Sequence, residues 1–452
     1  MIRRATRTRV RLAGALGIVG CLVAGMGPVG LPQVVGAAGP NPVSQWDKIA
    51  EDTVVGSGAF QIEGWVYMSY EGIAVYNAVV AIDGGYRPFG AAIQAAPGAS
   101  ADAAAVEAAY RVLVHYFPAS AATLGAAHAA SLASIGPGQA TTDGIAVGQQ
   151  AAASVIALRT GDGLQSPIGS SSSFPTRAPG PGVWRLTPPA YLPPQTPWIA
   201  TMTPFVVPTA DRFLPPPPPS LSSPEWVAQF NEIKAVGQDS TTLRTPAQTA
   251  TALFWTANAV RQDSRTVRDL AAAMNLGLVQ TARLAAMTDV VNADAGISVM
   301  YAKYHYLFWR PVTAIDPASV KPSGDGFGPV PGVDDGNAAT VEQTGWRPLV
   351  VTPNHPEYPA AHGTLTSAMD EVLAQFLGTN RIDVDIHGFD ASGPAGNLNA
   401  VHHFDRANDL RAEIINARLW AGLHYRGSSV AGVDLGRSVA KYDLRHAFGP
   451  TS

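Results

Sequence analysis

The sequence predicts an all-α fold, a large helical bundle crossed by one long proline-rich segment. Apolar residues recur at three- and four-residue spacing through most of the chain, which is typical of amphipathic helices. Alanine is abundant in these segments, and its small side chain lets helices approach one another closely. Strand-like runs are too few for a sheet, and we find no internal repeat of fixed period.

The composition indicates a folded chain with ample material for a core. Of its 452 residues, 46% are hydrophobic and 14% are charged, compared with about 25% charged in ordinary soluble domains. The net charge of −4 argues against nucleic acid as a partner, since such binding is driven by positive charge. A thinly charged surface is compatible with a homodimer.

Residues 1–38 have the pattern of a signal peptide, with arginines in 3–11, an apolar run at 12–26 and small residues at 35–37. The apolar run is too short and too rich in glycine for a membrane span. Cys21, the only cysteine, also ends a lipoprotein-like Ile-Val-Gly-Cys sequence, so a lipid-anchored form is the alternative to free secretion. Because the run stays apolar after Cys21, we expect the free secreted form. Its mature chain contains no cysteine, which excludes disulfides and thiolate–metal sites.

We expect a single domain over residues 39–452, built from three parts. The first, 39–164, carries helical patterns that we place at 47–82, 101–116, 120–134 and 142–160. The second, 165–224, holds nearly half of the prolines, which would suit a disordered linker. Disordered linkers are poor in aromatic residues, however, and this segment contains Trp184, Tyr191, Trp198, Phe205 and Phe213. We therefore expect an ordered segment, called the strap below, that these side chains hold across the helices.

The third part, 225–452, returns to helical patterns. Ser223 caps the first of them and Pro224 suits its first turn. Residues 383–386 look like a short β-strand, and 321–348 is a loop rich in glycine, proline and aspartate. We expect helices at 225–237, 246–261, 263–291 with a continuation to residue 310 as an option, 363–377 and 407–422.

Lys303 and Arg310 lie seven residues apart in a run, 301–311, that is otherwise aromatic and apolar except for His305. On a continuous helix this spacing places both cations on one face, two turns apart, and Pro311 would end that helix. Two cations in so apolar a surround require an anion nearby. The alternative is a pair at a helix end whose charged groups reach water over the aromatic rings.

Two later stretches add histidines. His362 opens a predicted helix, where free backbone N–H groups and a partial positive charge favour anions; a structural turn histidine is the alternative. Arg418 and His424 are six residues apart, about 120° around a continuous helix. They can converge only if the helix loosens near Gly422 or if the ligand spans both directions.

Three motifs thus occur in a fixed order: Lys303-x6-Arg310-Pro311, Pro359-x-x-His362-Gly363 and Arg418-x5-His424. As a set they resemble the vanadium-dependent haloperoxidase and type 2 phosphatidic-acid-phosphatase superfamily. The chain looks most like its secreted bacterial haloperoxidase-like branch, and the resemblance covers roughly residues 46–448. It implies the helical bundle of that superfamily.

The resemblance also implies a site for vanadate or phosphate. Lys303, Arg310 and Arg418 would hold the equatorial oxygens, and the backbone N–H of Ala361 would add a donor. His424 would be the axial ligand to vanadium or the nucleophile toward phosphorus, and His362 the acid–base group opposite it. Such a cationic cage stabilises developing charge without rearrangement. With hydrogen peroxide, polarised by Lys303, the family oxidises a halide to hypohalous acid, which then reaches a small organic acceptor.

Two positions depart from the family pattern. Ala360 stands where the motif Pro-Ser-Gly-His has serine, and the loss of that hydrogen bond costs about 1.5–3 kcal/mol, or roughly ten- to a hundredfold in anion affinity. Ser428 stands where the phosphatases have an aspartate that orients the nucleophilic histidine. We therefore expect the carboxylate partner of His424 to be missing, which counts against a good phosphatase.

His355 matches a position where bromide-oxidising relatives have histidine and a chloride-oxidising one has phenylalanine, so we expect bromide or iodide as the halide. The alternative is a loop residue packed against Pro356. An acid phosphatase with a phosphohistidine intermediate is the first alternative function. A non-halogenating relative that binds an oxyanion or rearranges a small molecule is the second. The pair His402-His403 suggests zinc, but no further ligand lies at a suitable spacing.

Overall fold

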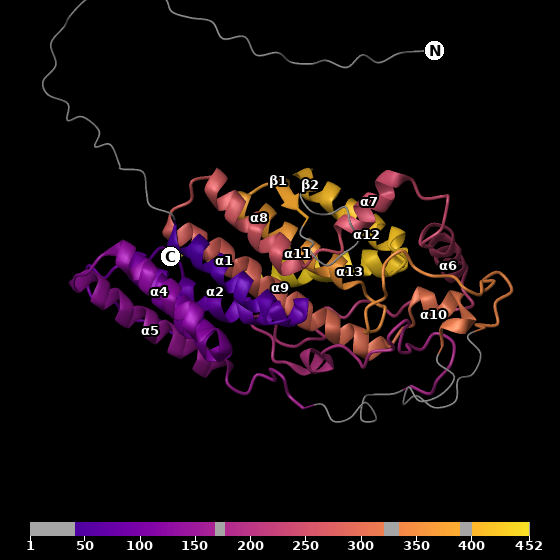
Figure 1. Ribbon diagram of the computed structural model, residues 1–452, viewed down its shortest axis with the longest axis horizontal. Coiled ribbons are helices and arrows are strands. Elements are labelled where there is room, and N and C mark those ends of the chain that lie inside the picture. Colours follow the sequence, from indigo (N-terminus) through magenta and orange to yellow (C-terminus); the bar gives the residue numbers. More distant parts are fainter. Residues whose placement is uncertain (1–40, 168–176, 321–333, 389–399, 452) are drawn as a thin grey trace, which may run out of the picture. The chain divides into compact units, whose positions relative to one another are not determined.

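The computed structural model describes residues 41–167, 177–320, 334–388 and 400–451. Helices dominate these ranges, as predicted (Figure 1). The described residues all belong to one contact unit, Pro40–Ser452, whereas the predicted signal peptide with Cys21 lies outside them. No helix in the described ranges combines the length and the apolar character needed to cross a membrane.

The N-terminal part contains five helices where the sequence predicts four. The segment expected as one helix at 47–82 is divided because Gly58 has a φ of +81° and Phe60 is extended. The other three predicted helices are confirmed. The five are α1 (Pro42–Gly56), α2 (Gln61–Asp83), α3 (Ala101–Tyr116), α4 (Ala121–Ile135) and α5 (Gln139–Arg159).

The C-terminal part differs more from the prediction. The helix expected at 263–291 is wrong in its bounds, since the chain breaks at Asn275, with a φ of 50°, and a new helix begins at Leu278. The helices are α6 (Pro224–Val236), α7 (Pro246–Phe254), α8 (Ala259–Ala273), α9 (Leu278–Tyr306), α10 (Pro311–Ile315), α11 (Ala361–Leu377), α12 (Ala407–Trp420) and α13 (Arg426–His446).

Helix α13 is absent from the sequence prediction, which places the last helix at 407–422. Glycines weaken its helical pattern. In the structure the same glycines let the helix approach α11 closely. A Cβ atom at Gly432 would lie 2.4 Å from the carbonyl oxygen of Ala360, and one at Gly436 would lie 2.0 Å from that of Thr364. This backbone contact fixes the start of α11, where His362 lies.

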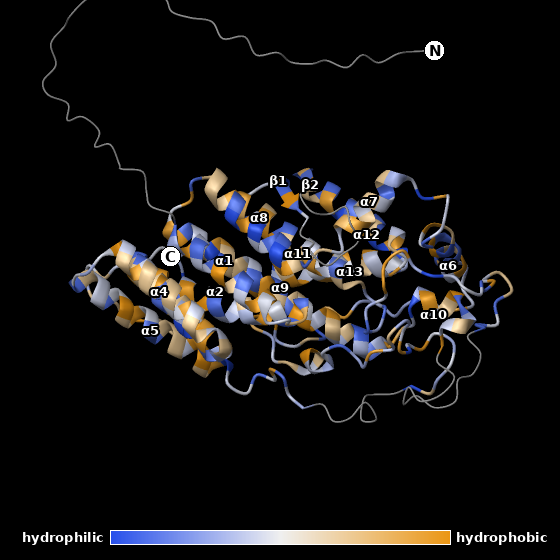
Figure 2. Cartoon of the chain, viewed as in Figure 1, coloured by the Kyte–Doolittle hydropathy of each residue, from blue (hydrophilic) through white to orange (hydrophobic). Residues whose placement is uncertain are grey.

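The core forms around α2 and α9. Helix α2 is buried along most of its length and packs against α9 and α3, while α11 and α13 pack against each other and against α9 (Figure 1). Hydrophobic and hydrophilic residues are intermixed along the helices (Figure 2), as the helical spacing predicts. A helix of this kind gains most of its stability from burying its apolar positions against neighbours.

The strap is ordered where the structure describes it, as predicted. The guanidinium of Arg159 on α5 donates to the carbonyl of Thr203 at 2.6 Å and lies 3.9 Å from the ring centroid of Phe205. The carboxylate of Asp294 on α9 accepts three backbone N–H groups, from residues 205–207, at 2.6–3.0 Å. The strap is therefore held to the helices by charged hydrogen bonds as well as by its aromatic rings.

A small antiparallel sheet joins β1 (Arg381–His387) to β2 (Val401–Arg406). The strand expected at 383–386 is confirmed, and the expectation that the chain forms no sheet is wrong for this hairpin. Ile382, Val384 and Ile386 are buried in alternation with exposed neighbours, and β1 contacts α8. The hairpin thus covers one side of the helical core.

Candidate active site

Lys303 and Arg310 reach the site by a different path from the continuous helix that their spacing suggests. Helix α9 ends one residue before Leu307, which adopts a left-handed conformation with a φ of 49°. Phe308 then pairs with Val183 of the strap in an isolated β-bridge, and the backbone of Arg310 is extended. Pro311 then begins α10 rather than ending a helix. The prediction that one continuous helix carries both cations on the same face is therefore wrong. Both cations are nevertheless fully buried, as an anion site requires.

Arg310 connects two of the predicted histidines. Its Nη2 lies 3.0 Å from Nδ1 of His355, and its Nη1 lies 3.2 Å from Nε2 of His424. Its Nε and Nη1 also donate to the carbonyl oxygens of His355 and Leu423, at 2.9 and 3.0 Å. A guanidinium has hydrogen-bond donors only. Nε2 of His424 must therefore be an acceptor, whereas Nδ1 of His355 also lies 3.2 Å from the carbonyl oxygen of Pro356.

Lys303 holds the loop that carries the second motif. Its ammonium donates to the carbonyl oxygens of Pro356 and Glu357, both at 2.9 Å. An ammonium has three donors. These two contacts therefore leave one hydrogen of Lys303 for a ligand.

Helix α11 begins at Ala361, two residues before the predicted start, so Ala361 and His362 are its first two positions. The first N–H groups of a helix have no acceptor within it, so the backbone N–H of Ala361 can serve a ligand. Ala360 is the N-cap residue and, as an alanine, provides no side-chain cap. Nε2 of His362 is buried and has no hydrogen-bond partner among the described residues.

Arg418 and His424 converge because the helix between them ends. Helix α12 stops at Trp420, and Gly422 has a φ of +76°, which favours glycine. A Cβ atom at Gly422 would also lie 2.4 Å from the carbonyl oxygen of Gly237. The loosening near Gly422 that the six-residue spacing requires is thus present.

A cavity of about 60 Å³ collects most of the predicted side chains. A single water needs roughly 10–15 Å³, so the cavity suits a group the size of a four-oxygen anion rather than a large organic molecule. Nε of Arg418 is buried without a partner in the described part of the chain, and its Nη1 donates to the carbonyl of Trp255 at 2.8 Å. The lining residues are Phe60, Gln61, Ile62, Pro353, His355, Ala361, His362, Leu365, Arg418 and His424. Lys303 and Arg310 are not among the residues that line it, but Arg310 contacts two that are.

Burial controls the charges at this site. It lowers the pKa of Arg418 to about 9 and that of Arg310 to about 10, and it lowers the pKa of Lys303 well below its usual value, with Arg310 adding repulsion. Burial also lowers the pKa of each of the three histidines well below the usual value, so their rings are neutral. Crowded, desolvated cations favour any anion that enters, because it restores the charge balance.

Glu357 is a site residue that the sequence analysis does not identify. Its fully buried carboxylate lies 2.9 Å from Nδ1 of His424 and accepts the backbone N–H of Tyr425 at 3.1 Å. Burial raises its pKa to about 7, and the nearby Arg310 and Lys303 oppose that rise. The expectation that His424 lacks a carboxylate partner, based on Ser428, is therefore wrong. The available signal was an acidic residue two positions before the second motif.

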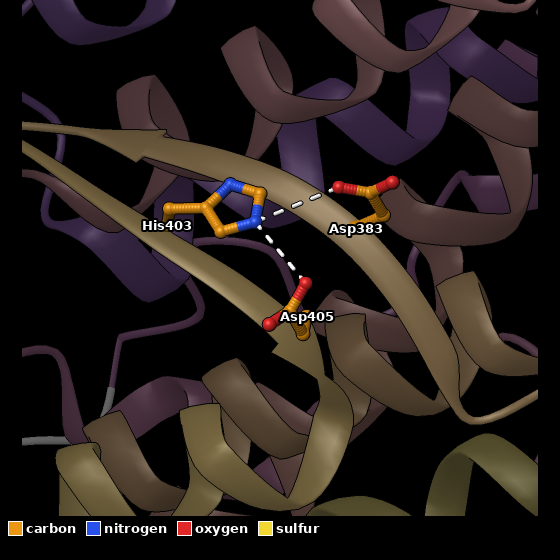
Figure 3. Close-up of side chains that lie close together, drawn as sticks. All are labelled: Asp383, His403 and Asp405. Carbon is orange, nitrogen blue, oxygen red and sulfur yellow. Dashed lines mark ion pairs between the residues drawn. The ribbon is translucent and has the colours of Figure 1, made fainter. Parts of the chain in front are cut away.

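A second group of polar residues lies on the hairpin. The pairing of β1 and β2 brings Nε2 of His403 to 3.5 Å from both Asp383 and Asp405 (Figure 3), and Nδ1 to 2.8 Å from Asp385. Sequence spacing did not reveal these partners of His403. All four side chains are exposed, so ion pairing in solvent accounts for the group.

Known proteins are similar to this chain in sequence and in fold. Residues 283–449 match the family described as the VCPO second helical-bundle domain. Vanadium chloroperoxidase of Curvularia inaequalis is 24% identical over 279 residues, in a match that covers 50% of this chain and 44% of that protein. The alignment thus spans less than half the length of that relative.

Two solved structures extend the similarity to nearly the whole chain. The first bacterial vanadium-dependent iodoperoxidase superposes with a TM-score of 0.74 at 20% identity, covering 91% of this chain and 97% of its own. A holo-type bacterial vanadium-dependent chloroperoxidase gives a TM-score of 0.65 at 15% identity, covering 86% and 93%. They show that this chain has the fold of these enzymes, and the family match over residues 283–449 supports the resemblance to the vanadium haloperoxidase superfamily.

Proposed function

We propose that this chain is a vanadate-dependent haloperoxidase that uses hydrogen peroxide to oxidise bromide or iodide to hypohalous acid. The observation that carries the proposal is the small cavity with its unpaired donors. Nε of Arg418 and Nε2 of His362 are buried there with no partner among the described residues. Buried polar atoms in native proteins are nearly always paired, so unpaired ones at a cavity indicate a missing ligand.

The donor set fits vanadate. A tetrahedral oxyanion needs several hydrogen-bond donors and positive charge, and the cavity offers the guanidinium of Arg418, the N–H of Ala361 and the nearby Arg310. His424 would hold the vanadium through Nε2, the atom that lies 3.2 Å from Nη1 of Arg310. When bound, vanadate would supply the Lewis acidity that activates peroxide for halide oxidation.

The remaining residues hold charge and protons. Lys303, with one ammonium hydrogen left after its two carbonyl contacts, would polarise the peroxide. His362 is neutral, because burial lowers its pKa, and can accept a proton from peroxide as it binds. Arg418 and the N–H of Ala361 already face the cavity before the anion arrives, whereas Arg310 would exchange its contact with His424 for one with the anion.

His355 supports bromide or iodide as the halide. Its Nδ1 lies 3.0 Å from the guanidinium of Arg310, which can only donate, and 3.2 Å from the carbonyl oxygen of Pro356, which can only accept. The ring lines the cavity and lies 5.9 Å from that of Phe60, which places a polar ring beside an apolar wall. Such a surround suits a large, weakly hydrated anion better than a small one.

An acid phosphatase remains the second candidate, and Glu357 favours it. A phosphohistidine mechanism needs a nucleophilic imidazole oriented by a hydrogen-bond acceptor, and Glu357 lies 2.9 Å from Nδ1 of His424. The same cage would bind phosphate in place of vanadate. We further propose that the chain acts outside the cytoplasm, on the basis of residues 1–38, with lipid attachment at Cys21 as the alternative.

The test is bromination of a phenolic dye by the purified mature chain with peroxide and bromide, with and without orthovanadate. We expect turnover only with vanadate, and loss of turnover in His424→Ala but not in His446→Ala, a histidine in the last turn of α13. Iodide and chloride in place of bromide test the halide preference. Phosphate release from a phosphomonoester, without any halide oxidation, would favour the phosphatase. Inactivity in both assays would favour the non-halogenating relative.

A further inference from the structure

We infer that Glu357 positions His424 for its contact with the oxyanion, replacing the aspartate that the phosphatases carry at the position of Ser428. The inference deepens the proposed function, because it rests on His424 facing the bound anion. Glu357 lies two residues before the second motif and 67 residues before His424 in the chain. Its role therefore depends on the fold and not on local sequence.

Two contacts determine which nitrogen of His424 carries the hydrogen. Nε2 lies 3.2 Å from Nη1 of Arg310, which can only donate, so Nε2 is an acceptor. The hydrogen of the neutral ring is then on Nδ1, which lies 2.9 Å from the Glu357 carboxylate. This arrangement leaves the Nε2 lone pair on the side of Arg310, where an oxyanion would bind. A buried acceptor at Nδ1 is the usual device that fixes the ring orientation and tautomer of such a histidine.

The position of Glu357 is itself fixed. Its carboxylate accepts the backbone N–H of Tyr425 at 3.1 Å, and its carbonyl accepts the ammonium of Lys303 at 2.9 Å. Among the described residues, His424 is the only group that pairs with this carboxylate as an ion-pair partner within 4.0 Å. A residue that served only to neutralise Arg310 or Lys303 would contact those cations directly.

Ser428 explains why the family aspartate is absent. Ser428 is buried, and its hydroxyl lies 3.5 Å from the carbonyl oxygen of Glu357. An aspartate there would place a second carboxylate beside the first in a buried region, and two such charges repel strongly. The two positions are therefore alternative sources of one carboxylate.

The first test reads the tautomer in the ligand-free protein by nitrogen NMR of labelled histidine, with His424 assigned from His424→Gln. We expect the Nδ1–H tautomer in the wild type and its loss in Glu357→Ala. Glu357→Gln retains a carbonyl acceptor, so it should retain part of the preference. Glu71→Gln removes another buried carboxylate, on α2, and should change nothing. An Nε2–H tautomer in the wild type would overturn the inference.

The second test moves the carboxylate. We expect Glu357→Ala to weaken orthovanadate binding by roughly 10- to 100-fold, the usual effect of losing such a supporting contact. The double variant Glu357→Ala/Ser428→Asp should recover at least part of this affinity, whereas Ser428→Asp alone should weaken it. If Glu357→Ala binds as the wild type does, or the double variant is no better than the single one, Glu357 is not the positioning residue. Should Glu357→Ala not fold, Glu357→Gln supplies the same comparison.

The two tests separate this inference from the proposed function. A chain without haloperoxidase activity that still shows the Nδ1–H tautomer and its loss in Glu357→Ala would contradict only the proposed reaction. Inorganic phosphate then replaces orthovanadate as the binding probe. An active enzyme in which replacement of Glu357 changes neither the tautomer of His424 nor the anion affinity would contradict only the inference.

Discussion

Replacement of Arg418 by lysine isolates one hydrogen bond of the anion site. Arg418→Lys keeps a positive charge near the cavity but removes the Nε donor. This donor has no partner among the described residues, so its removal breaks no described hydrogen bond. The contact of Nη1 with the carbonyl of Trp255, at 2.8 Å, can pass to the lysine ammonium. The change should therefore affect anion binding far more than folding.

The expected loss follows from the energy of one charge-assisted hydrogen bond. Such bonds contribute about 1.5–3 kcal/mol, which corresponds to roughly a 10- to 100-fold increase in Kd for the oxyanion. Arg418→Ala should cost more, because it also removes the buried charge. The melting temperature of Arg418→Lys should stay close to that of the wild type.

Isothermal titration with orthovanadate and, separately, with phosphate measures the effect directly. Arg437→Lys is the matched control, because Arg437 lies on α13 and pairs with Glu371 at 3.4 Å instead of lining the cavity. We expect the control to bind as the wild type does. An Arg418→Lys variant that binds both anions within about twofold of the wild type would refute the hydrogen-bond argument.

Three further changes test other parts of the account. Ala360→Ser should lower the Kd for orthovanadate by roughly tenfold, because the hydroxyl adds a hydrogen bond to the anion. It should also raise the melting temperature, since serine can cap α11. Calorimetry that shows neither change would contradict the role given to a serine at this position. Gly422→Ala should lower the free energy of unfolding in urea by at least about 1–2 kcal/mol. The alanine would have to adopt a left-handed φ, and its Cβ would lie 2.4 Å from the carbonyl oxygen of Gly237. A variant as stable as the wild type would show that this turn can relax. Asp443 is fully buried with neither oxygen paired among the described residues, and burial and then Asp294 raise its pKa well above the usual value. The protonated form is thus favoured in the folded state, so its stabilising contribution is full below the unfolded pKa and is lost as pH rises through the folded one. Asp443→Asn should flatten the fall in unfolding free energy between about pH 4 and 8 by at most ~1.4 kcal/mol per pH unit, and an unchanged slope would contradict the raised pKa.

Motif spacing predicted which residues gather at the site better than how the chain brings them there. Lys303 and Arg310 are both buried beside the proposed anion site, but the left-handed Leu307 separates them where a helix was expected. Their aromatic neighbours fit a helix as well as they fit the observed turn and bridge. By contrast, the geometry of Arg418 and His424 requires a break, and Gly422 provides it.

The features that the sequence did not reveal depend on contacts between distant segments. Glu357 and His424 meet just before the start of α11 and of α13, where these two helices pack closely through glycines of α13. The same glycines weaken the helical pattern of α13 in the sequence. The partners of His403 come from strand pairing. A carboxylate that is missing at one position, here Ser428, can be supplied by a residue far away in the sequence, here Glu357. A single sequence does not reveal such a replacement. The chemical roles of the site residues remain predictions.

A crystal structure of the chain grown with orthovanadate tests the central claim most directly. The account predicts a vanadium atom in the cavity beside Nε2 of His424, with its oxygens within hydrogen-bond distance of Nε of Arg418 and the N–H of Ala361. Arg310 should have moved from its ligand-free contact with His424, at 3.2 Å, onto an oxygen of the anion. Vanadate bound only elsewhere, or a cavity that holds ordered water at saturating vanadate, would contradict the account.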